Sequence, residues 1–481
     1  MAASRPNVLL VLSDDHGYAD RSALGIDPAV STPALDRIAA EGVTCTDAYV
    51  AAPICNPSRA ALISGAYPAR WGSTWFLDTR FDDSRTTVAE RLRDLGYTTG
   101  YFGKVHYGPE QPGDRACPPE QGFDESYYGL AGRQQGRLHY TTHTRAAVEE
   151  YGPEGSWRMA VQPMLHHRDE VELEGFLTAE LGRRAREFID GAGDRPFFAM
   201  VAFNAVHNFC WQLPPEELER RGLPTRADWD EDGEASYAEW YDGAVSPHLE
   251  HGREYYLAQL ELMDAEVGRL LDDLDDRGLA EDTIVVYLTD NGGSTCNYGS
   301  NAPLSGTKYT LAEGGVRVPF LVRWPGGGWS GGRECASLVS AMDLYPTILA
   351  AAGDDPGRLP DVDGIDQSAP WRGEPTGGHE ALHWECGFQS AVRVGDLKLR
   401  VVHGDDPEAA GVRTVEHTDP GDGVTLHDLR ADVGEQVDLV SERPDDVRRL
   451  WDAHSAWLHQ VGRADLAAKH SARVAEAVRP S

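Results

Sequence analysis

Residues 7–17 read NVLLVLSDDHG, and this stretch decides the fold: five apolar residues, beginning at Val8, lead almost directly into Asp14 and Asp15. A short, unbroken apolar run is typical of a strand that is buried on both faces of a parallel sheet. Ligands of such sheets bind beyond the carboxyl ends of the strands, where loops and helix N-termini converge. Two adjacent carboxylates at that place either bind a hard cation or repel each other.

Further apolar runs repeat this pattern along the chain. Each follows a helix-like stretch, and the helix and strand pairs are 87–95 with 98–102, 174–189 with 197–203, and 254–275 with 284–288. This alternation predicts an α/β fold with a large mixed, mostly parallel sheet that is flanked by helices. The segment from about 107 to 162 lacks the pattern and is predicted to form long loops, which are often functional at that length.

The C-terminal part of the chain has a different pattern. A linker rich in Pro, Asp and Gly covers 353–378, after which 382–402 has strand character and 444–461 a helical period. We therefore expect a main α/β domain over 1–375 and a smaller domain of antiparallel sheet plus helix over 376–462. The last segment, 463–481, is Ala-rich and charged, and is interpreted as a tail or a helical oligomer contact.

Composition excludes several classes of partner. The 481 residues carry 44 Lys and Arg against 78 Asp and Glu, a formal net charge of −34. A surface this acidic repels nucleic acid and anionic lipid, so neither is expected as a partner, and an anionic substrate needs a local cationic site. No apolar run approaches the ~20 residues of a membrane span. The N-terminal apolar run is also shorter than the core of an export signal, so we expect a cytoplasmic, reduced protein unless a presequence has been removed.

Cysteine and lysine usage adds two further observations. The seven cysteines are scattered without paired spacing, which predicts neither a disulfide framework nor a zinc module. The only lysines are Lys104, Lys308, Lys398 and Lys469, and every other basic residue is Arg. A lysine in this chain is therefore a candidate for a specific role, although Lys398 and Lys469 are interpreted as chance survivors of coding bias.

A second polar motif follows the apolar run at 284–288. It contains Asp290 and Asn291, so that strand ends as the first one does. Three carboxylates and an amide oxygen brought together form an oxygen cage suited to Ca²⁺ or Mg²⁺. The alternative is that both motifs are turn and cap residues, which are commoner than metal sites when each is taken alone.

Residues 55–65 read CNPSRAALISG and predict a helix. Pro57 and Ser58 fit its first turn, and the apolar residues continue it. Cys55 would then lie at the helix N-terminus, where the helix dipole favours an anion or a nucleophile.

This segment resembles the maturation signature of the sulfatase family, within the alkaline-phosphatase superfamily. In that family the cysteine is oxidised to formylglycine, whose hydrated aldehyde is the nucleophile. The chain departs from the usual Leu-Thr-Gly-Arg ending, because it has Ile63-Ser64-Gly65-Ala66 there. The resemblance covers nearly the whole chain. The other matching segments are Gly103-Lys104-Val105-His106, Asn204-Ala205-Val206-His207, Asp290-Asn291-Gly292, Lys308 with 313–319, 392–398 and 426–429.

The resemblance implies a role for each matching residue. Asp14, Asp15, Asp290 and Asn291 would bind Ca²⁺, which also touches formylglycine 55. Lys104 and Lys308 would neutralise the sulfate, and Arg59 would stabilise the hydrated aldehyde. His207 would protonate the leaving group, and His106 would take a proton from the remaining hydroxyl so that the covalent sulfoenzyme releases sulfate. The implied partners are a small-molecule or saccharide sulfate ester and a formylglycine-generating enzyme.

Other functions fit the same residues. A phosphonate monoester or phosphodiester hydrolase uses a similar tetrahedral oxyanion, and the stretch 103–110 also resembles N-sulfoglucosamine sulfohydrolases. A non-catalytic oxyanion- or Ca²⁺-binding protein with an unmodified Cys55 is the alternative outside enzymes. Candidate pocket aromatics, which more often simply pack, are Trp71, Trp75 and Trp211. The histidines given no site role are His16, His139, His143, His166 and His167.

Overall fold

The computed structural model describes residues 5–479 except for 76–79, 109, 132–135, 142–143, 146, 150–151, 153–160, 174, 227–247, 356, 358–360, 375–376 and 417. Within this part of the chain, a ten-stranded sheet forms the centre of the molecule. The order across the sheet is β11-β2-β10-β9-β1-β8-β4-β5-β6-β7. The strands in that order are Arg333–Cys335, Val43–Cys45, Phe320–Arg323, Thr283–Thr289, Asn7–Ser13, Phe197–Ala202, Thr98–Val105, Glu125–Leu130, Met164–His166 and Asp169–Val171.

The middle of this sheet is parallel and its edges are partly antiparallel. Strand β1 pairs in parallel with both β8 and β9, and β4 pairs in parallel with β8 and β5. Antiparallel pairs join β10 to β9 and β2, β5 to β6, and β6 to β7. The sequence prediction of a mixed, mostly parallel sheet is therefore confirmed.

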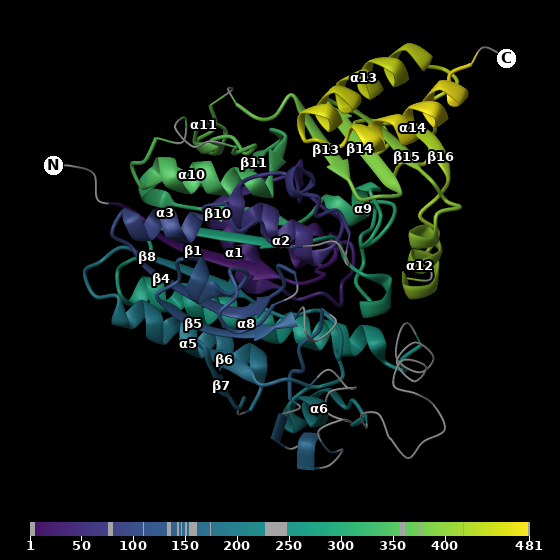
Figure 1. Cartoon of the computed structure of the whole chain (residues 1–481). Coiled ribbons are helices and arrows are strands. Elements are labelled where there is room, and N and C mark those ends of the chain that lie inside the picture. The colour runs from purple at the N-terminus through teal and green to yellow at the C-terminus, as the bar shows by residue number, and fades with distance from the viewer. Residues whose placement is uncertain are drawn as a thin grey trace.

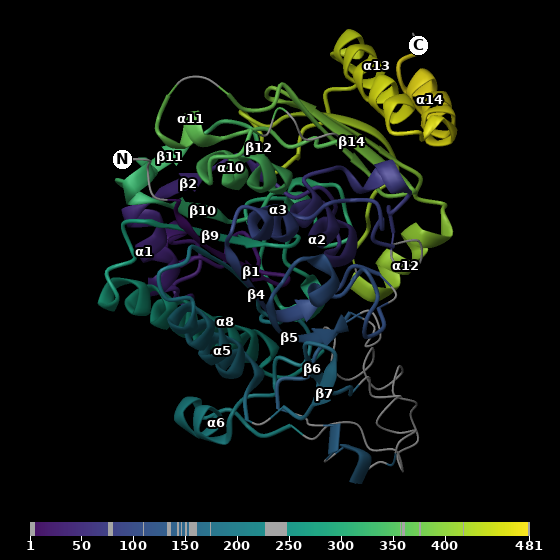
Figure 2. The same cartoon turned by 60° about the vertical axis from the view of Figure 1, so that its left-hand side comes forward.

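Helices cover both faces of the sheet (Figures 1 and 2). One face is covered by α1 (Pro33–Glu41), α5 (Leu177–Gly191) and α8 (Gly252–Asp276). The other is covered by α2 (Cys55–Ser64), α3 (Val88–Asp94) and α10 (Leu344–Ala351). Further helices are α6 (Pro215–Arg221), α9 (Glu313–Val316), α11 (Ser368–Trp371) and α12 (Pro407–Glu416), and a two-stranded sheet pairs β3 (Ala48–Tyr49) with β12 (Val339–Ser340).

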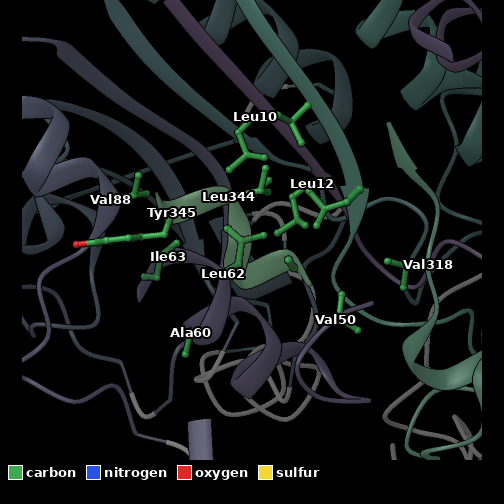
Figure 3. Close-up of a cluster of buried hydrophobic side chains, with 14 of the residues drawn as sticks. Leu10, Leu12, Val50, Ala60, Leu62, Ile63, Val88, Val318, Leu344 and Tyr345 are labelled. Carbon is green, nitrogen blue, oxygen red and sulfur yellow. The ribbon is translucent and has the colours of Figure 1, made fainter. Parts of the chain in front are cut away.

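The first strand explains why both layers form. Leu10 and Leu12 face the layer that contains α2 and α10, where Leu62, Leu344 and their neighbours pack (Figure 3). Val11, the residue between them, faces the layer of α5 and α8, as Leu9 does. Burial of both faces removes apolar side chains from water on two sides at once, and each fully buried Leu or Val contributes about 1.5–3 kcal/mol of transfer free energy.

A second, antiparallel sheet follows in the C-terminal part. It contains β13 (Ala381–Glu385), β14 (Gln389–Val394), β15 (Leu397–Val402) and β16 (Gly423–Asp428). Helices α13 (Pro444–Gln460) and α14 (Ala464–Ala477) pack against it (Figure 1). The segment interpreted as a tail thus contains a helix, whose buried face includes Leu466, Ala467 and Val474.

The prediction of loops from 107 to 162 is wrong at one place. Strand β5 lies inside that range and pairs with β4 along six residues. Its sequence, ESYYGL, contains aromatic rather than aliphatic residues, so it lacks the unbroken apolar run that identified the other strands. No helix in the described part of the chain combines the length and the hydropathy needed to cross a bilayer.

Candidate active site

The two acidic motifs meet because β1 and β9 are adjacent and in register. Ser13 pairs with Thr289, so the residues that follow each strand, Asp14 and Asp290, leave the sheet side by side. The backbone N–H of Asp15 donates to Asp290 Oδ1 over 3.3 Å. All of these carboxylates are buried, so the motifs are not ordinary exposed turns.

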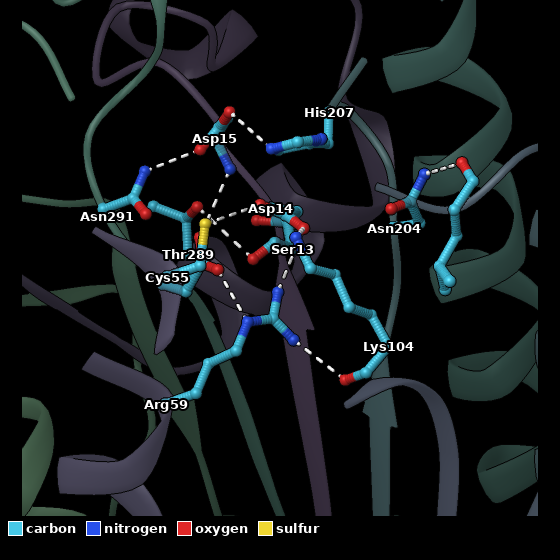
Figure 4. Close-up of polar contacts among 12 residues, drawn as sticks. Ser13, Asp14, Asp15, Cys55, Arg59, Lys104, Asn204, His207, Thr289 and Asn291 are labelled. Atoms are coloured by element: carbon cyan, nitrogen blue, oxygen red, sulfur yellow. Dashed lines mark hydrogen bonds and ion pairs between the residues drawn. The ribbon is translucent and has the colours of Figure 1, made fainter. Parts of the chain in front are cut away.

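Cys55 is the first residue of α2, as the sequence predicts, and its side chain points into the acidic cluster (Figure 4). Its Sγ lies 3.7 Å from Asp14 Oδ1. Burial raises the pKa of the Cys55 thiol well above its ordinary value, and the cations Lys104 and Lys308 do not offset this effect. An unmodified Cys55 is therefore a protonated thiol and a poor nucleophile.

Arg59, one turn along α2, connects three parts of the site (Figure 4). Its Nε donates to Asp290 Oδ2 over 2.7 Å, and its Nη2 lies 3.3 Å from Asp14 Oδ2. Its Nη1 donates to the backbone carbonyl of Lys104 over 3.1 Å. Burial raises the pKa of Asp290, but the charges of Arg59, Lys104 and Lys308 together outweigh this effect and leave that pKa below its ordinary value.

Both predicted lysines reach the cluster from separate segments. Lys104, near the end of β4, forms an ion pair with Asp14, and both side chains are fully buried. Lys308 Nζ lies 2.8 Å from Asp15 Oδ2 and 3.0 Å from His207 Nε2. Burial lowers the pKa of Lys308, but the Asp15 carboxylate and the other acidic groups around it together outweigh burial and raise it, so Lys308 is an ammonium group.

The two predicted histidines are buried beside these cations. His207 Nε2 lies 3.4 Å from Asp15 Oδ2, and burial together with the charges of Lys104 and Lys308 lowers its pKa. Burial, followed by the charge of Lys104, also lowers the pKa of His106. The imidazole of His106 lies against Gly136, at which a Cβ would be 3.2 Å from His106 Cε1. Both imidazoles are therefore neutral at physiological pH and available as proton acceptors.

The residues present fit a hard cation. Asp14, Asp15, Cys55 and His207 each offer a ligand atom, and these four atoms lie within 4.8 Å of one another. Asn291 donates its amide to Asp15 Oδ1 over 2.7 Å, while its buried Oδ1 has no hydrogen-bond partner. Burial and the Asp290 carboxylate raise the pKa of Asp14 to about 7. Carboxylates that repel one another beside an unsatisfied carbonyl oxygen are the donor set that Ca²⁺ or Mg²⁺ stabilises.

The charges of the cluster are balanced without a metal. Three carboxylates face three cationic side chains, which are Asp14, Asp15, Asp290, Arg59, Lys104 and Lys308. A divalent cation would make the cluster net positive, although the chain as a whole carries a formal charge of −34. Such a site could attract an oxyanion against the general field of the protein.

One residue of the cluster was not predicted from sequence. Asn297 donates its amide to Asp15 Oδ2 over 2.5 Å from a short helical turn after β9. It matches no motif, and only its place a few residues after Asp290 connects it with the site.

The remaining histidines and tryptophans pack or form local bonds. His16 contacts the Tyr287 hydroxyl and the Asp20 carbonyl, and His139 stacks on Phe209. His166 and His167 contact Glu125 at the sheet edge, whereas His143 lies outside the described residues. The aromatic contacts are Trp71 with Arg85, Trp75 with Tyr309 and Phe388, and Trp211 with Phe209.

This fold, with acidic, cationic and imidazole groups around a helix N-terminus, defines a hydrolase of the alkaline-phosphatase superfamily. The family model named Sulfatase matches residues 6–354. Human arylsulfatase A is 31% identical over 472 residues, which cover 91% of this chain and 84% of that protein. The chain therefore belongs to the sulfatase family and is a sulfate ester hydrolase.

Solved structures have the same fold as this chain. The crystal structure of Ps i-CgsB in complex with k-i-k-neocarrahexaose has a TM-score of 0.76 and 27% identity, and the match covers 94% of this chain and 93% of that one. The phosphonate monoester hydrolase of Agrobacterium radiobacter shares the fold, with a TM-score of 0.60, 21% identity and coverage of 98% and 96%.

Proposed function

We propose that the protein hydrolyses sulfate esters through a formylglycine made from Cys55, with Ca²⁺ bound at the acidic cluster. The observation that carries this proposal is the position of Cys55 at the start of α2, against Asp14 and inside the buried charge cluster. The raised pKa of its thiol argues against catalysis by cysteine itself, whereas a hydrated aldehyde supplies two hydroxyl groups at the same place.

The metal would be held by Asp14, Asp15, Asp290 and Asn291, whose oxygens are hard ligands. When bound, Ca²⁺ supplies electrostatic stabilisation of a sulfate oxygen and of the nucleophile oxygen. Mg²⁺ is the alternative ion, but it demands a stricter octahedral geometry.

The cationic side chains would then bind the sulfate group. Lys104 and Lys308 approach from β4 and from the segment before α9, and each already neutralises one aspartate of the cluster. Arg59 follows Cys55 by one turn of α2, and from there its guanidinium would stabilise the hydrated residue 55. Preorganised cations in a buried site stabilise developing negative charge far more than they do in water.

Three proton transfers complete the proposed reaction. One hydroxyl of residue 55 attacks sulfur and passes its proton to the adjacent Asp14 carboxylate, the bond from sulfur to the leaving oxygen breaks, and a covalent sulfoenzyme forms as the alcohol leaves. The Lys308 ammonium, 3.0 Å from His207 Nε2, makes this pair the proposed proton source for the leaving oxygen. His106, which is neutral, would accept the proton of the remaining hydroxyl, so that the aldehyde reforms and sulfate is expelled.

The proposed substrate is a small-molecule or saccharide sulfate ester. Its support is the similarity to human arylsulfatase A and to Ps i-CgsB, which was crystallised in complex with k-i-k-neocarrahexaose. We also propose a formylglycine-generating enzyme as the partner during maturation, since the Cys-x-Pro-Ser-Arg motif is present. Homo-oligomerisation is a further possibility that a sizing measurement would test.

Comparison of kcat/KM for an aryl sulfate, an aryl phosphonate monoester and an N-sulfated glucosamine tests the substrate class. The proposal predicts that the O-sulfate ester is preferred, whereas a preference for the phosphonate or the N-sulfate would contradict the proposed substrate class.

Cys55→Ala should abolish turnover and leave the melting temperature nearly unchanged, because alanine fits the volume of the buried side chain without adding a polar group. Retained turnover of Cys55→Ala would show that residue 55 does not supply the nucleophile.

A further inference from the structure

Lys398 is fully buried in β15, so its interpretation as a chance survivor is wrong. Its Nζ lies 2.7 Å from Glu313 Oε1 and 3.4 Å from Glu435 Oε1, and neither carboxylate reaches solvent appreciably. A buried lysine persists only where carboxylates compensate its charge. Lys398 therefore has a specific role that composition alone did not reveal.

Glu435 bonds to two points on the segment that leads into α9. Its Oε2 accepts a hydrogen bond from the Ser305 hydroxyl over 2.8 Å and from the backbone N–H of Glu313 over 2.7 Å. The charges of Lys398 and Arg400 outweigh burial and lower the pKa of Glu435 to about 2. Glu435 is thus an ionised acceptor, and charge-assisted bonds of this type are the stronger ones.

Glu313 fixes the far end of the same segment. Its Oε2 accepts from the Tyr49 hydroxyl over 2.7 Å and from Arg317 Nη1 over 3.3 Å, while its other oxygen faces Lys398. The segment 305–317 is therefore anchored near both ends by carboxylates that share one ammonium group.

Lys308 lies between these two anchors. Its backbone N–H donates to the Gly293 carbonyl over 3.2 Å, and its Nζ reaches Asp15 and His207. The segment also packs directly on the second acidic motif, since the N–H of Gly292 donates to the Gly315 carbonyl over 3.0 Å. A displacement of the segment would move the Lys308 ammonium away from His207.

We infer that Lys398 is a positioning residue for catalysis: by pairing with Glu313 and Glu435, it fixes the 305–317 segment and so holds Lys308 against Asp15 and His207. The small C-terminal sheet thereby contributes to the active site without touching substrate. Without the lysine, two buried carboxylates would face each other with less compensation, from Arg317, Arg393 and Arg400, and would separate. This inference depends on the proposed role of Lys308 and His207 in protonating the leaving oxygen.

The test compares Lys398→Met with Lys469→Met in matured enzyme. Lys469 is the matched control, because it pairs with Asp406 over 3.1 Å on the exposed face of α14. Turnover of phenyl sulfate, which has a poor leaving group, is measured beside that of 4-nitrophenyl sulfate, which needs little protonation. We expect Lys398→Met to lower kcat about tenfold or more for phenyl sulfate, to lower it less for 4-nitrophenyl sulfate, and to change KM less than kcat. Lys469→Met should match the wild type.

An equal loss for both esters, or a loss of melting temperature with unchanged kcat, would mean that Lys398 is only structural and would overturn the inference. If Lys398→Met does not fold, Glu435→Gln provides the test, because Lys398 keeps Glu313 as its partner. A neutral amide holds Ser305 and Glu313 less firmly, so the same leaving-group dependence is expected, and wild-type kinetics would overturn the inference. Absence of wild-type turnover on both esters would instead contradict the proposed function.

Discussion

Asp14 and Asp290 lie side by side because Ser13 is in register with Thr289 on adjacent parallel strands. Arg59 bonds to both carboxylates from the first turns of α2, which places Cys55 next to them. Residues that follow two adjacent strands of the ten-stranded sheet and residues of one helix therefore share a single buried cluster. The distances within this cluster depend on the register of β1 and β9. A displacement of β1, β9 or α2 should therefore move the side chains that the other two contribute.

Metal removal should abolish activity. Dialysis against a chelator is expected to lower kcat/KM by about a hundredfold or more, because the charge-balanced cluster then lacks the divalent cation that would stabilise the sulfate oxygen and the nucleophile. Added Ca²⁺ should restore turnover. Asn291→Leu should raise the Ca²⁺ concentration for half-maximal activity by roughly tenfold or more, since it removes an oxygen ligand of similar volume. Glu125→Gln, in the half-buried group with His166 and His167, should have no effect, and chelator-resistant turnover would exclude a metal role.

Lys104→Arg should inactivate the enzyme although it preserves the charge. Lys104 is fully buried against Asp14, and a guanidinium is larger, planar and cannot occupy the space of a compact ammonium. We expect kcat/KM to fall by about a hundredfold or more, close to the effect of Lys104→Ala. The same replacement at the surface, Lys469→Arg, should leave kcat/KM unchanged. Near wild-type activity of Lys104→Arg would show that only net charge matters at this position.

Gly292→Ala should disrupt the site. A Cβ at Gly292 would lie 1.7 Å from the Gly314 carbonyl oxygen, so the Asp290 motif and the 305–317 segment would have to separate. We expect a lower melting temperature and a loss of turnover of about tenfold or more. The matched control is Gly268→Ala in α8, where the new Cβ meets only Ala34 Cβ at 3.6 Å. That variant should retain activity and gain up to about 1 kcal/mol of stability. Equal melting temperatures and equal turnover of the two variants would contradict the close contact between Gly292 and Gly314.

Stability should decrease in mild acid through His383. Burial lowers the pKa of His383 from 6.5 to about 4, and its Nδ1 lies 3.1 Å from that of His454. The unfolded chain therefore binds a proton at higher pH than the folded one. The contribution to the free energy of unfolding is complete above pH 6.5 and is lost as the pH falls from 6.5 toward about 4, with a total of about 3 kcal/mol.

The measurement is denaturant unfolding between those pH values. His383→Gln should make the dependence shallower by about this amount, because its side chain does not titrate, while the other buried histidines still contribute. His459→Gln, at an exposed position on α13, should not change it. A wild-type unfolding free energy that is constant over this range would contradict the assignment.

The sequence predicted the sheet core and most of the cluster for one physical reason. Unbroken apolar runs identify strands buried on both faces, and parallel strands bring the residues after them to one edge. Asp14, Asp290 and Lys104 follow from that rule together with the resemblance to the family. Their burial and mutual contacts could be anticipated, whereas the register that pairs Ser13 with Thr289 required the structure.

Other features depend on tertiary contacts that leave no local pattern. Strand β5 is stabilised by its pairing with β4, although its aromatic sequence resembles that of the neighbouring loops. Asn297 acquires its role only because its turn folds back on Asp15. Lys398 did have a signal, its rarity, but no sequence rule connects a strand of the small sheet with Glu313.

The mass of the peptide that contains residue 55, measured in the same preparation as kcat, tests the central claim most directly. The account predicts that the fraction of residue 55 present as the aldehyde is proportional to kcat across preparations with and without a formylglycine-generating enzyme. A fully active preparation in which residue 55 is entirely the unmodified thiol would contradict it.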